Sequence, residues 1–216
     1  MPKIKYNSGS IINKFLSYRL VVLTSNYIFQ GIRYMSLGEK IYKISVTIIF
    51  SLLVFLLLNN LVMSIIIGHT LNYIINGQFF VVYRYLSNGR TMSNMTLTDF
   101  LNLIKKNIVF FTVKDVLITG SFCRGKMSKT SDLDIRIYHK SDLFSSIKAY
   151  LFASKLRFFG LILKFPVDVF CFSQLSFLDK LDKIEIPVNF LNHNSIIKKY
   201  PDSINYKEQL RKIEIN

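Results

Sequence analysis

Acidic residues are scarce at the start of the chain: among the first ninety residues Glu39 is the only one. The 216 residues together hold 13 acidic and 28 basic side chains, a formal net charge of +15. A surface with that balance is not neutral, and it favours polyanionic neighbours such as nucleotides, nucleic acid or anionic lipid. Since acids and bases are mixed only after Arg90, the composition divides the chain into two parts there.

Cysteine is also rare, with only Cys123 and Cys171 in the whole chain. Two cysteines exclude a disulfide-stapled secreted scaffold, and their spacing is not that of a metal site. They favour a reducing compartment. Internal repeats and low-complexity tracts are absent from the sequence as well.

Charge is missing altogether from the forty residues between Ile44 and Tyr83. A bilayer crossing needs about 20 apolar residues, so this run predicts a membrane-embedded helical segment over residues 44–86. A buried core helix would be shorter and would show a polar face, which Ile44–Leu58 lacks. A cleavable secretory signal is excluded, because the run starts too late and no small-residue cleavage site follows it.

Basic residues flank the run on both sides, which predicts that both flanks lie on the cytoplasmic side. The segment would then be a helical hairpin or re-entrant pair, turning near Asn59-Asn60 or near Gly68-His69-Thr70. Residues 1–43 form a basic region whose apolar residues fall at helical spacing. That region predicts either an amphipathic helix on anionic lipid or an ordinary packed helix.

The second part of the chain alternates helical and β-rich stretches over residues 96–200. We expect helices near Thr98–Lys106 and Leu143–Phe159, with strands near Val113–Ile118 and in LILKFPVDVFCF. A further helix is expected after the Gly-Ser turn that follows the first strand. Residues 201–216 are expected to form a polar C-terminal tail.

Three carboxylates stand within the β-rich stretches. Strand alternation puts Asp132 and Asp134 on one face, with Cα atoms roughly 7 Å apart, where both side chains can converge on a hard cation. Asp168 lies in the apolar run VDVFCF, where an acid is costly unless it is paired or bound to metal. Mg²⁺ favours such a site of carboxylates, phosphate oxygens and water.

A Gly-Ser pair, Gly120-Ser121, comes at the end of the first expected strand. If a helix begins there, its free backbone N–H groups can face a phosphate. The basic residues of the same connection would neutralise a triphosphate, namely Arg124, Lys126 and Lys129. Each of these features is common alone, but together with the acids they favour a nucleotide-binding metal site.

The combined pattern resembles the DNA polymerase β-like nucleotidyltransferase superfamily, especially its minimal nucleotidyltransferase branch. The resemblance covers about residues 96–200 and is carried by Gly120-Ser121, Arg124-Gly125, Ser131-Asp132-Leu133-Asp134 and Asp168. It implies an α/β (α+β) nucleotidyltransferase domain, with a small mixed sheet flanked by helices. The α-helical membrane-embedded segment ahead of it departs from the small soluble members.

The resemblance also implies roles for individual residues. Asp132 and Asp134 would hold two Mg²⁺ ions, and Asp168 would bind metal on the acceptor side and help to activate the attacking hydroxyl. Gly120 and Ser121 would grip the phosphates of the nucleotide. Arg124 and Lys129 would be further nucleotide contacts, although Arg124 is better suited to bracing the loop than to chemistry.

We therefore expect a membrane-associated enzyme, with its catalytic domain on the cytoplasmic side, that transfers a nucleoside monophosphate from an NTP to an unidentified hydroxyl or phosphate acceptor. One alternative is an antitoxin-like protein that adenylylates a partner protein. Another is a non-catalytic nucleotide-binding membrane adaptor, against which the clustered, mutually repelling carboxylates argue. Nucleic acid is not an expected partner, because +8 of the charge (nine minus one) lies in residues 1–90, where anionic lipid explains it.

Overall fold

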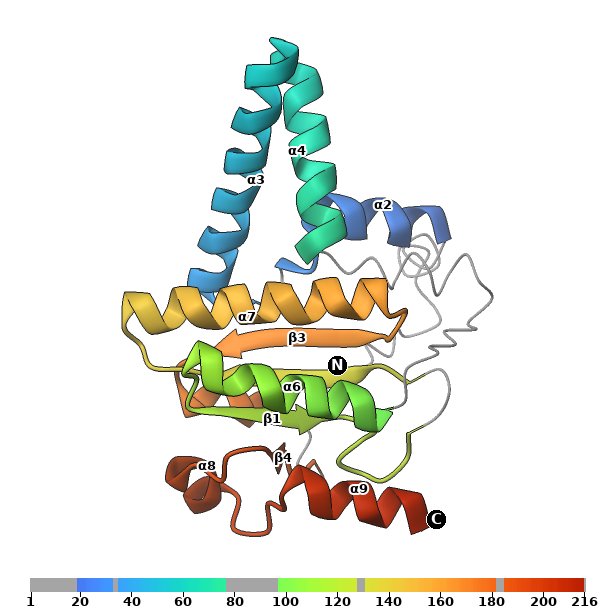
Figure 1. Cartoon of the computed structure of the whole chain (residues 1–216), viewed down its shortest axis with the longest axis vertical. Helices are drawn as coiled ribbons and strands as arrows, with labels where there is room; N and C mark the ends of the chain where they lie inside the picture. The colour runs from blue at the N-terminus through green and yellow to red at the C-terminus, as the bar shows by residue number, and fades with distance from the viewer. Residues whose placement is uncertain (1–18, 33–34, 77–96, 128–130, 182–184, 216) are drawn as a thin grey trace, which may run out of the picture. The chain divides into compact units, whose positions relative to one another are not determined.

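The computed structural model of the chain describes residues 19–32, 35–76, 97–127, 131–181 and 185–215. The chain divides into two compact units, Met1–Gly89 and Arg90–Asn216 (Figure 1). Each unit is considered by itself below. Of the basic region 1–43, in which the sequence predicts an amphipathic or packed helix, residues 1–18 lie outside the described residues.

Three helices make up the described part of the first unit: α2 (Arg19–Phe29), α3 (Leu37–Leu58) and α4 (Leu61–Asn76). Helices α3 and α4 form an antiparallel hairpin (Figure 1). The hairpin turns at Asn59-Asn60, where Asn59 adopts the left-handed conformation with φ 48°. Asn60 begins α4 by accepting a hydrogen bond from the backbone N–H of Met63. The turn therefore uses the first of the two positions that the sequence offered.

Small and polar residues line the inner side of this hairpin in two rows with a spacing of four. Asn72 Nδ2 donates to Thr47 Oγ1 at 2.7 Å and to the backbone oxygen of Lys43 at 3.0 Å. A Cβ atom on Gly68 would lie 2.5 Å from the backbone nitrogen of Ser51, so the two helices touch there. The rows consist of Glu39, Lys43, Thr47 and Ser51 on α3, and of Ser64, Gly68, Asn72 and Asn76 on α4.

A four-stranded sheet forms the centre of the second unit, in the order β3-β2-β1-β4. Strand β1 (Asp115–Thr119) pairs antiparallel with β2 (Leu133–Tyr138) and with β4 (Val188–Asn189), whereas β3 (Val167–Phe172) pairs parallel with β2. The mixed sheet of the expected fold class is thus confirmed. Its parallel pair is joined by a long helical crossover, as parallel strands require.

That crossover is α7 (Leu143–Ile162), which begins at Asp142, whose side chain accepts the backbone N–H of Ser145. Helix α7 packs on one face of the sheet beside α6 (Leu97–Phe111). The rings of Phe111 and Phe152 stack between the two helices with centroids 5.0 Å apart. The observed helices are longer than the expected ones, but they lie in the same places.

The opposite face of the sheet is covered at one end by the short helices η2 (Leu175–Lys180) and α8 (Asn194–Lys199). Their side chains Leu178 and Ile196 join Leu117, Tyr138 and Phe172 of the strands in one buried cluster.

Residues 201–216 differ from the expected polar tail. Helix α9 (Tyr206–Ile215) is part of the second unit, because the ring of Tyr206 stacks on Phe190 with centroids 4.2 Å apart. The composition of the helix does not indicate this contact, since half of its ten residues are charged and only Tyr206 and Gln209 are buried among its described side chains.

Candidate functional site

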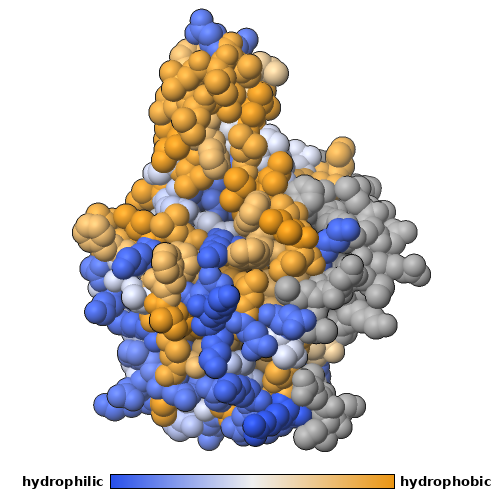
Figure 2. Space-filling model, in the orientation of Figure 1, coloured by the Kyte–Doolittle hydropathy of each residue, from blue (hydrophilic) through white to orange (hydrophobic). Residues whose placement is uncertain are grey.

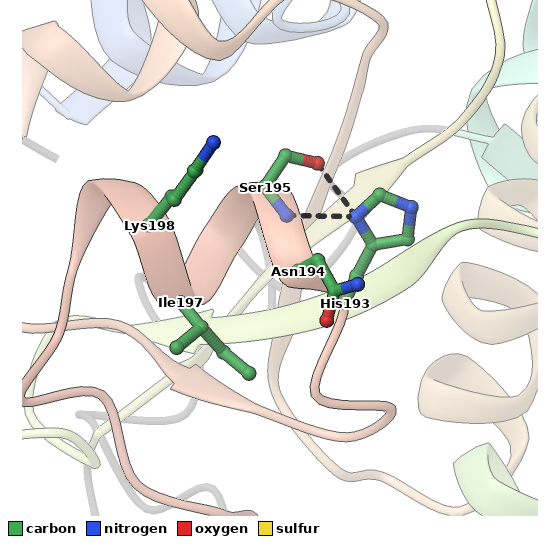
Figure 3. A pocket seen from close by; sticks show the side chains of 5 residues that line it. All are labelled: His193, Asn194, Ser195, Ile197 and Lys198. Atoms are coloured by element: carbon green, nitrogen blue, oxygen red, sulfur yellow. Dashed lines mark hydrogen bonds between the residues drawn. The ribbon is translucent and has the colours of Figure 1, made fainter.

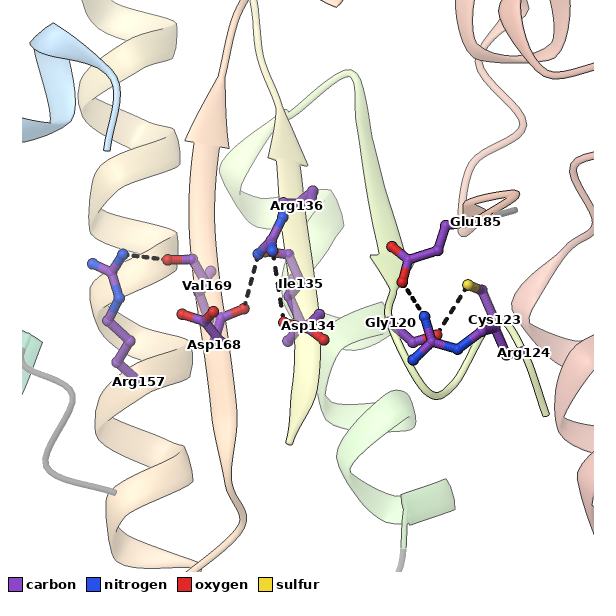
Figure 4. Close-up of polar contacts among 10 residues, drawn as sticks. All are labelled: Gly120, Cys123, Arg124, Asp134, Ile135, Arg136, Arg157, Asp168, Val169 and Glu185. Carbon is purple, nitrogen blue, oxygen red and sulfur yellow. Dashed lines mark hydrogen bonds and ion pairs between the residues drawn. The ribbon is translucent and has the colours of Figure 1, made fainter. Parts of the chain in front are cut away.

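Asp134 and Asp168 lie directly opposite each other on the parallel strands β2 and β3 (Figure 4). Each is only 8% exposed. Both side chains point away from α7. The Cys171 side chain of β3 faces α7, since its Sγ contacts the backbone oxygen of Ala149, and Asp168 lies an odd number of residues from Cys171, so strand alternation puts it on the opposite face. The sheet thus brings together two of the three acids that the sequence singled out.

Asp132 stands just before β2 and is half-buried. Its negative charge raises the pKa of both Asp134 and Asp168, so it belongs to the same electrostatic neighbourhood. Nevertheless, the described part of the chain contains no group of three or more His, Cys, Asp or Glu side chains gathered closely enough to hold a metal ion. The acids available as metal ligands are therefore the pair Asp134 and Asp168, with Asp132 nearby.

Burial and mutual repulsion disfavour the charged forms of Asp134 and Asp168. Burial is the main cause that raises the pKa of Asp168 to about 6, and the charge of Asp134 adds to it. Burial likewise raises the pKa of Asp134. Asp168 Oδ2 is a buried oxygen with no hydrogen-bond partner among the described residues. A buried, unsatisfied carboxylate of this kind is stabilised by a cation or a proton.

Arg136 is the one cation that bonds to this pair among the described residues, and sequence reasoning missed it. Its Nη2 lies 3.6 Å from Asp134 Oδ1, and its Nη1 donates to the backbone oxygen of Asp168 at 3.3 Å (Figure 4). The guanidinium also lies over the ring of Phe170 at 4.8 Å. Strand alternation could have indicated it, since Arg136 follows Asp134 by two residues and shares its face.

Gly120 ends β1 with φ +72°, a left-handed conformation that favours glycine. A Cβ atom at this position would lie 2.0 Å from Asp134 Oδ2. Only a residue without a side chain lets the Asp134 carboxylate lie against the turn. Gly120 and the acid pair are therefore one structural feature, as the spacing of the motif suggested.

The helix expected after Gly120-Ser121 is absent from the described residues, which is a correction to the sequence analysis: residues 121–125 form successive turns. Gly125, with φ +64°, donates to Phe122 O, and Lys126 N–H donates to Ser121 O. Ser121 Oγ lies 3.1 Å from Met127 Sδ. Any phosphate contact here would come from a turn and the Ser121 hydroxyl, not from a helix end.

One of the expected basic contacts, Arg124, is engaged with a residue outside the carboxylate pair. Arg124 is exposed and forms an ion pair with Glu185 (Figure 4). Lys129 lies outside the described residues. The loop is instead braced by Gln209 of α9, which donates to Phe122 O at 2.8 Å and to Cys123 O at 3.2 Å. Neither Glu185 nor Gln209 could be linked to this loop from sequence, since each is more than sixty residues away from it.

A surface pocket lies elsewhere, at α8, and its lining contains none of the expected site residues (Figure 3). His193 caps this helix, with its Nδ1 2.6 Å from Ser195 Oγ. The side chain of His193 therefore has a structural task. The pocket is lined by His193, Asn194, Ser195, Ile197 and Lys198.

With this geometry established, the chain was compared with known proteins. The family model described as "Nucleotidyltransferase domain" matches residues 100–199. This part of the chain is a nucleotidyltransferase domain. Searches of curated proteins and of solved structures found no match. The matched range contains β1, the Gly120 turn, the acids and β3, and ends at the last residue of α8.

The nucleotidyltransferase domain implies divalent cations, and the donor set was tested for its fit to them. Hard oxygen ligands suit Mg²⁺, which commonly takes one or two carboxylates and completes its shell with phosphate oxygens and water. Asp134 and Asp168 supply two such carboxylates, one with a buried orphan oxygen. The residues fit a cation that is completed by substrate.

Proposed function

We propose that the chain is a membrane-associated nucleotidyltransferase that moves a nucleoside monophosphate from an NTP to a hydroxyl or phosphate acceptor. The observation that carries the transfer activity is the buried pair Asp134 and Asp168, in register on adjacent strands beside the side-chain-free Gly120. Structural carboxylates rarely keep a buried oxygen unsatisfied, as Asp168 Oδ2 is among the described residues, because an unsatisfied charge destabilises the fold.

Each residue has a task in this proposal. Asp132 and Asp134 bind the cations that accompany the nucleotide, and Gly120 leaves room for the phosphates next to Asp134. Ser121 offers a hydroxyl donor at the same turn. Asp168 orients the acceptor and helps to take the proton from its attacking hydroxyl. Two Mg²⁺ ions, when bound, would supply charge for the leaving pyrophosphate and lower the pKa of the acceptor hydroxyl.

Arg136 holds the pair in place in this scheme. Its guanidinium supplies positive charge where two carboxylates would otherwise repel each other, and so opposes the rise in the pKa of each. Its bond to the Asp168 backbone fixes β3 against β2 at the site. Arg136 is therefore a positioning residue.

The membrane part of the proposal rests on the hairpin of α3 and α4. Helix α3 is long and apolar enough to cross a membrane, and only 6% of its most apolar window is buried. At 1.5 Å per residue its 22 residues extend about 33 Å, similar to the hydrocarbon core of a bilayer.

The distribution of polar and apolar side chains in the hairpin is the reverse of that in a water-soluble helix pair. Its small and polar rows face inward, while its outward residues are apolar along most of its length (Figure 2). Leu56 and Leu57, for example, are 80% and 83% exposed. Helices in lipid associate through small and hydrogen-bonding residues, whereas helices in water bury their apolar faces. The arrangement therefore favours lipid around the hairpin over a soluble core.

The proposal places the catalytic domain on the cytoplasmic side. A hairpin returns both of its ends to one side of the bilayer, and the basic residues that flank the uncharged run favour the cytoplasm for that side. NTP substrates are supplied there.

The decisive experiment compares the purified full chain with Asp134→Asn. The variant should lose Mg²⁺-dependent release of pyrophosphate from NTP by about 100-fold or more, because a ligand of the cations that accompany the reacting phosphates is removed. Asp142→Asn, which changes an exposed acid at the start of α7, should retain activity. Full activity of Asp134→Asn would refute the site.

The acceptor is identified by supplying NTPs with labelled bases and a membrane extract. Label that becomes attached to a lipid or glycan would identify the acceptor class. Label on a protein would favour the antitoxin-like alternative. Nucleotide binding without pyrophosphate release from the unmodified chain would favour the adaptor.

A further inference from the structure

Helix α7 carries exposed apolar side chains on the side turned away from the sheet. Its opposite side is buried, with Phe152, Ala153 and Leu156 fully covered. At 100° per residue, the exposed residues fall within an arc of about 100°. This α7 ridge consists of Leu143, Phe144, Ile147, Leu151, Phe158 and Ile162, which are between 39% and 79% exposed.

A ridge of this kind is unusual for a helix on the surface of a soluble domain. Such helices place polar residues opposite their buried face, and a helix that is apolar all round is normally covered on every side. Phe144 is 79% exposed and Leu143 is 72% exposed. Contiguous apolar surface of this kind marks an interaction site.

The charges around the ridge indicate what covers it. Helix α7 contains no acidic residue, and its lysines Lys148 and Lys155 border the ridge by helical position. The nearest acid in the chain is Asp142, whose carboxylate is engaged with the first turn of the helix. An apolar strip bordered by lysines fits an interface that is apolar within and negatively charged at its rim, as an anionic bilayer surface is.

We propose that α7 lies on an anionic lipid surface through this ridge, as a second membrane contact besides the hairpin. The inference rests on the proposed membrane association and extends it. The ridge residues enter the boundary between headgroups and acyl chains, and Lys148 and Lys155 reach the headgroups.

This contact fixes the direction in which the catalytic site faces. Helix α7 and the acid pair are on opposite faces of the sheet. The Cys171 side chain of β3 points toward α7, where its Sγ contacts the backbone oxygen of Ala149. Asp168 is three residues earlier on the same strand, so its side chain points to the other face. With α7 on lipid, Asp134 and Asp168 face the aqueous phase. Nucleotide and acceptor then reach the site from water, which favours a soluble acceptor, or a long headgroup, over the lipid directly beneath α7.

The test uses the absence of tryptophan from the chain. Phe144→Trp and Leu151→Trp each place a single tryptophan on the ridge of the full chain, and Ile197→Trp places one at a 40% exposed position on α8 as the matched control. Each variant is reconstituted in vesicles of phosphatidylcholine and phosphatidylserine, with or without bromine on the acyl chains. Brominated lipid should lower the emission of both ridge tryptophans about twofold or more and leave Ile197→Trp unchanged.

Charge is tested separately. Replacing both Lys148 and Lys155 by Gln, or omitting phosphatidylserine, should reduce the quenching of Leu151→Trp. Quenching that is indifferent to both changes would overturn the anionic part of the proposal.

A tryptophan in the hairpin, Leu53→Trp, separates the two membrane contacts. If Leu53→Trp is quenched while the ridge tryptophans are not, the ridge proposal fails and the hairpin proposal stands. A blue-shifted but unquenched ridge tryptophan would mean that protein, such as a second copy of the chain, covers the ridge. If quenching is absent at Leu53 but present at the ridge, the hairpin proposal fails instead.

Discussion

At the scale of single residues, the candidate site depends on one missing side chain and one unsatisfied oxygen. Gly120 has no Cβ, so the carboxylate of Asp134 lies against the end of β1. Asp168 Oδ2 is buried and has no hydrogen-bond partner in the part of the chain that the structure describes. The buried charge opposes folding, and the close approach at Gly120 excludes any residue with a side chain. Their coincidence at one place favours a functional explanation over a structural one.

Gly120→Ala tests this relation. The new methyl group would displace the Asp134 carboxylate by an ångström or more, and a displacement of that size lowers catalytic rate by about 100-fold. Gly125→Ala is the matched control, because its φ of +64° imposes similar backbone strain while its Cβ would meet only Gln209 Nε2, at 3.9 Å. Pyrophosphate release and thermal melting are measured for both variants. Equal activity of the two would contradict the proposed role of the close approach.

At the scale of elements, the hairpin shows how a spacing of four builds an interface between two helices. Residues four apart lie on one side of a helix, so two facing rows can meet along the whole length. Where Gly68 meets Ser51 the backbones touch, and beyond it Asn72 bonds to Thr47. Asn76 Nδ2 bonds to Asn72 Oδ1 at 3.0 Å and continues the row. The sequence does not by itself identify the facing row on α3, because the pairing depends on how the two helices meet.

Gly68→Leu should force the helices apart, because the side chain would meet the backbone nitrogen and Cα of Ser51 as well as its hydroxyl. Overpacking of this kind destabilises by about 1–3 kcal/mol. Spin labels at Ile48→Cys and Leu71→Cys, in a chain without its two native cysteines, should report a longer and broader distance. Ile66→Ala, on the outer side of α4, should leave the distance unchanged. An unaltered distance in Gly68→Leu would show that the close contact is not what sets the spacing.

At the scale of the whole molecule, two compact units carry two different kinds of surface. The first unit has its polar groups inside and its apolar groups outside. The second has an ordinary apolar core around a mixed sheet, with one apolar ridge. The units are therefore expected to respond differently to salt and to extraction.

Residues 90–216 expressed alone should fold, as judged by circular dichroism, and should bind anionic vesicles weakly. High salt should release them, because screened headgroups no longer attract Lys148 and Lys155. The full chain should remain with the membrane under high salt and alkaline carbonate, since apolar contact between its hairpin and the acyl chains does not depend on charge. If the isolated unit also resists carbonate, the division between the two units is wrong.

The sequence alone determined the features that depend on local pattern. An uncharged run predicts a membrane helix whatever surrounds it, and alternation in LDIRIY and VDVFCF predicts strands with their acids on one face. The uncharged run and the alternation depend on neighbours within a few residues, so no tertiary information is needed to recognise them. The mixed sheet with flanking helices was implied by the resemblance to nucleotidyltransferases and is confirmed.

Only the tertiary structure decided which residues meet across the chain. The register that sets Asp134 opposite Asp168, the ion pair of Arg124 with Glu185 and the support of the turn by Gln209 all join residues more than thirty positions apart. The turn after Gly120 replaced the expected helix because Gly120 and Gly125 adopt left-handed backbone and the loop is held by α9. Likewise, exposure of the α7 ridge appears only when the sheet has taken the other side of the helix, since sequence gives the apolar character of a residue but not what covers it.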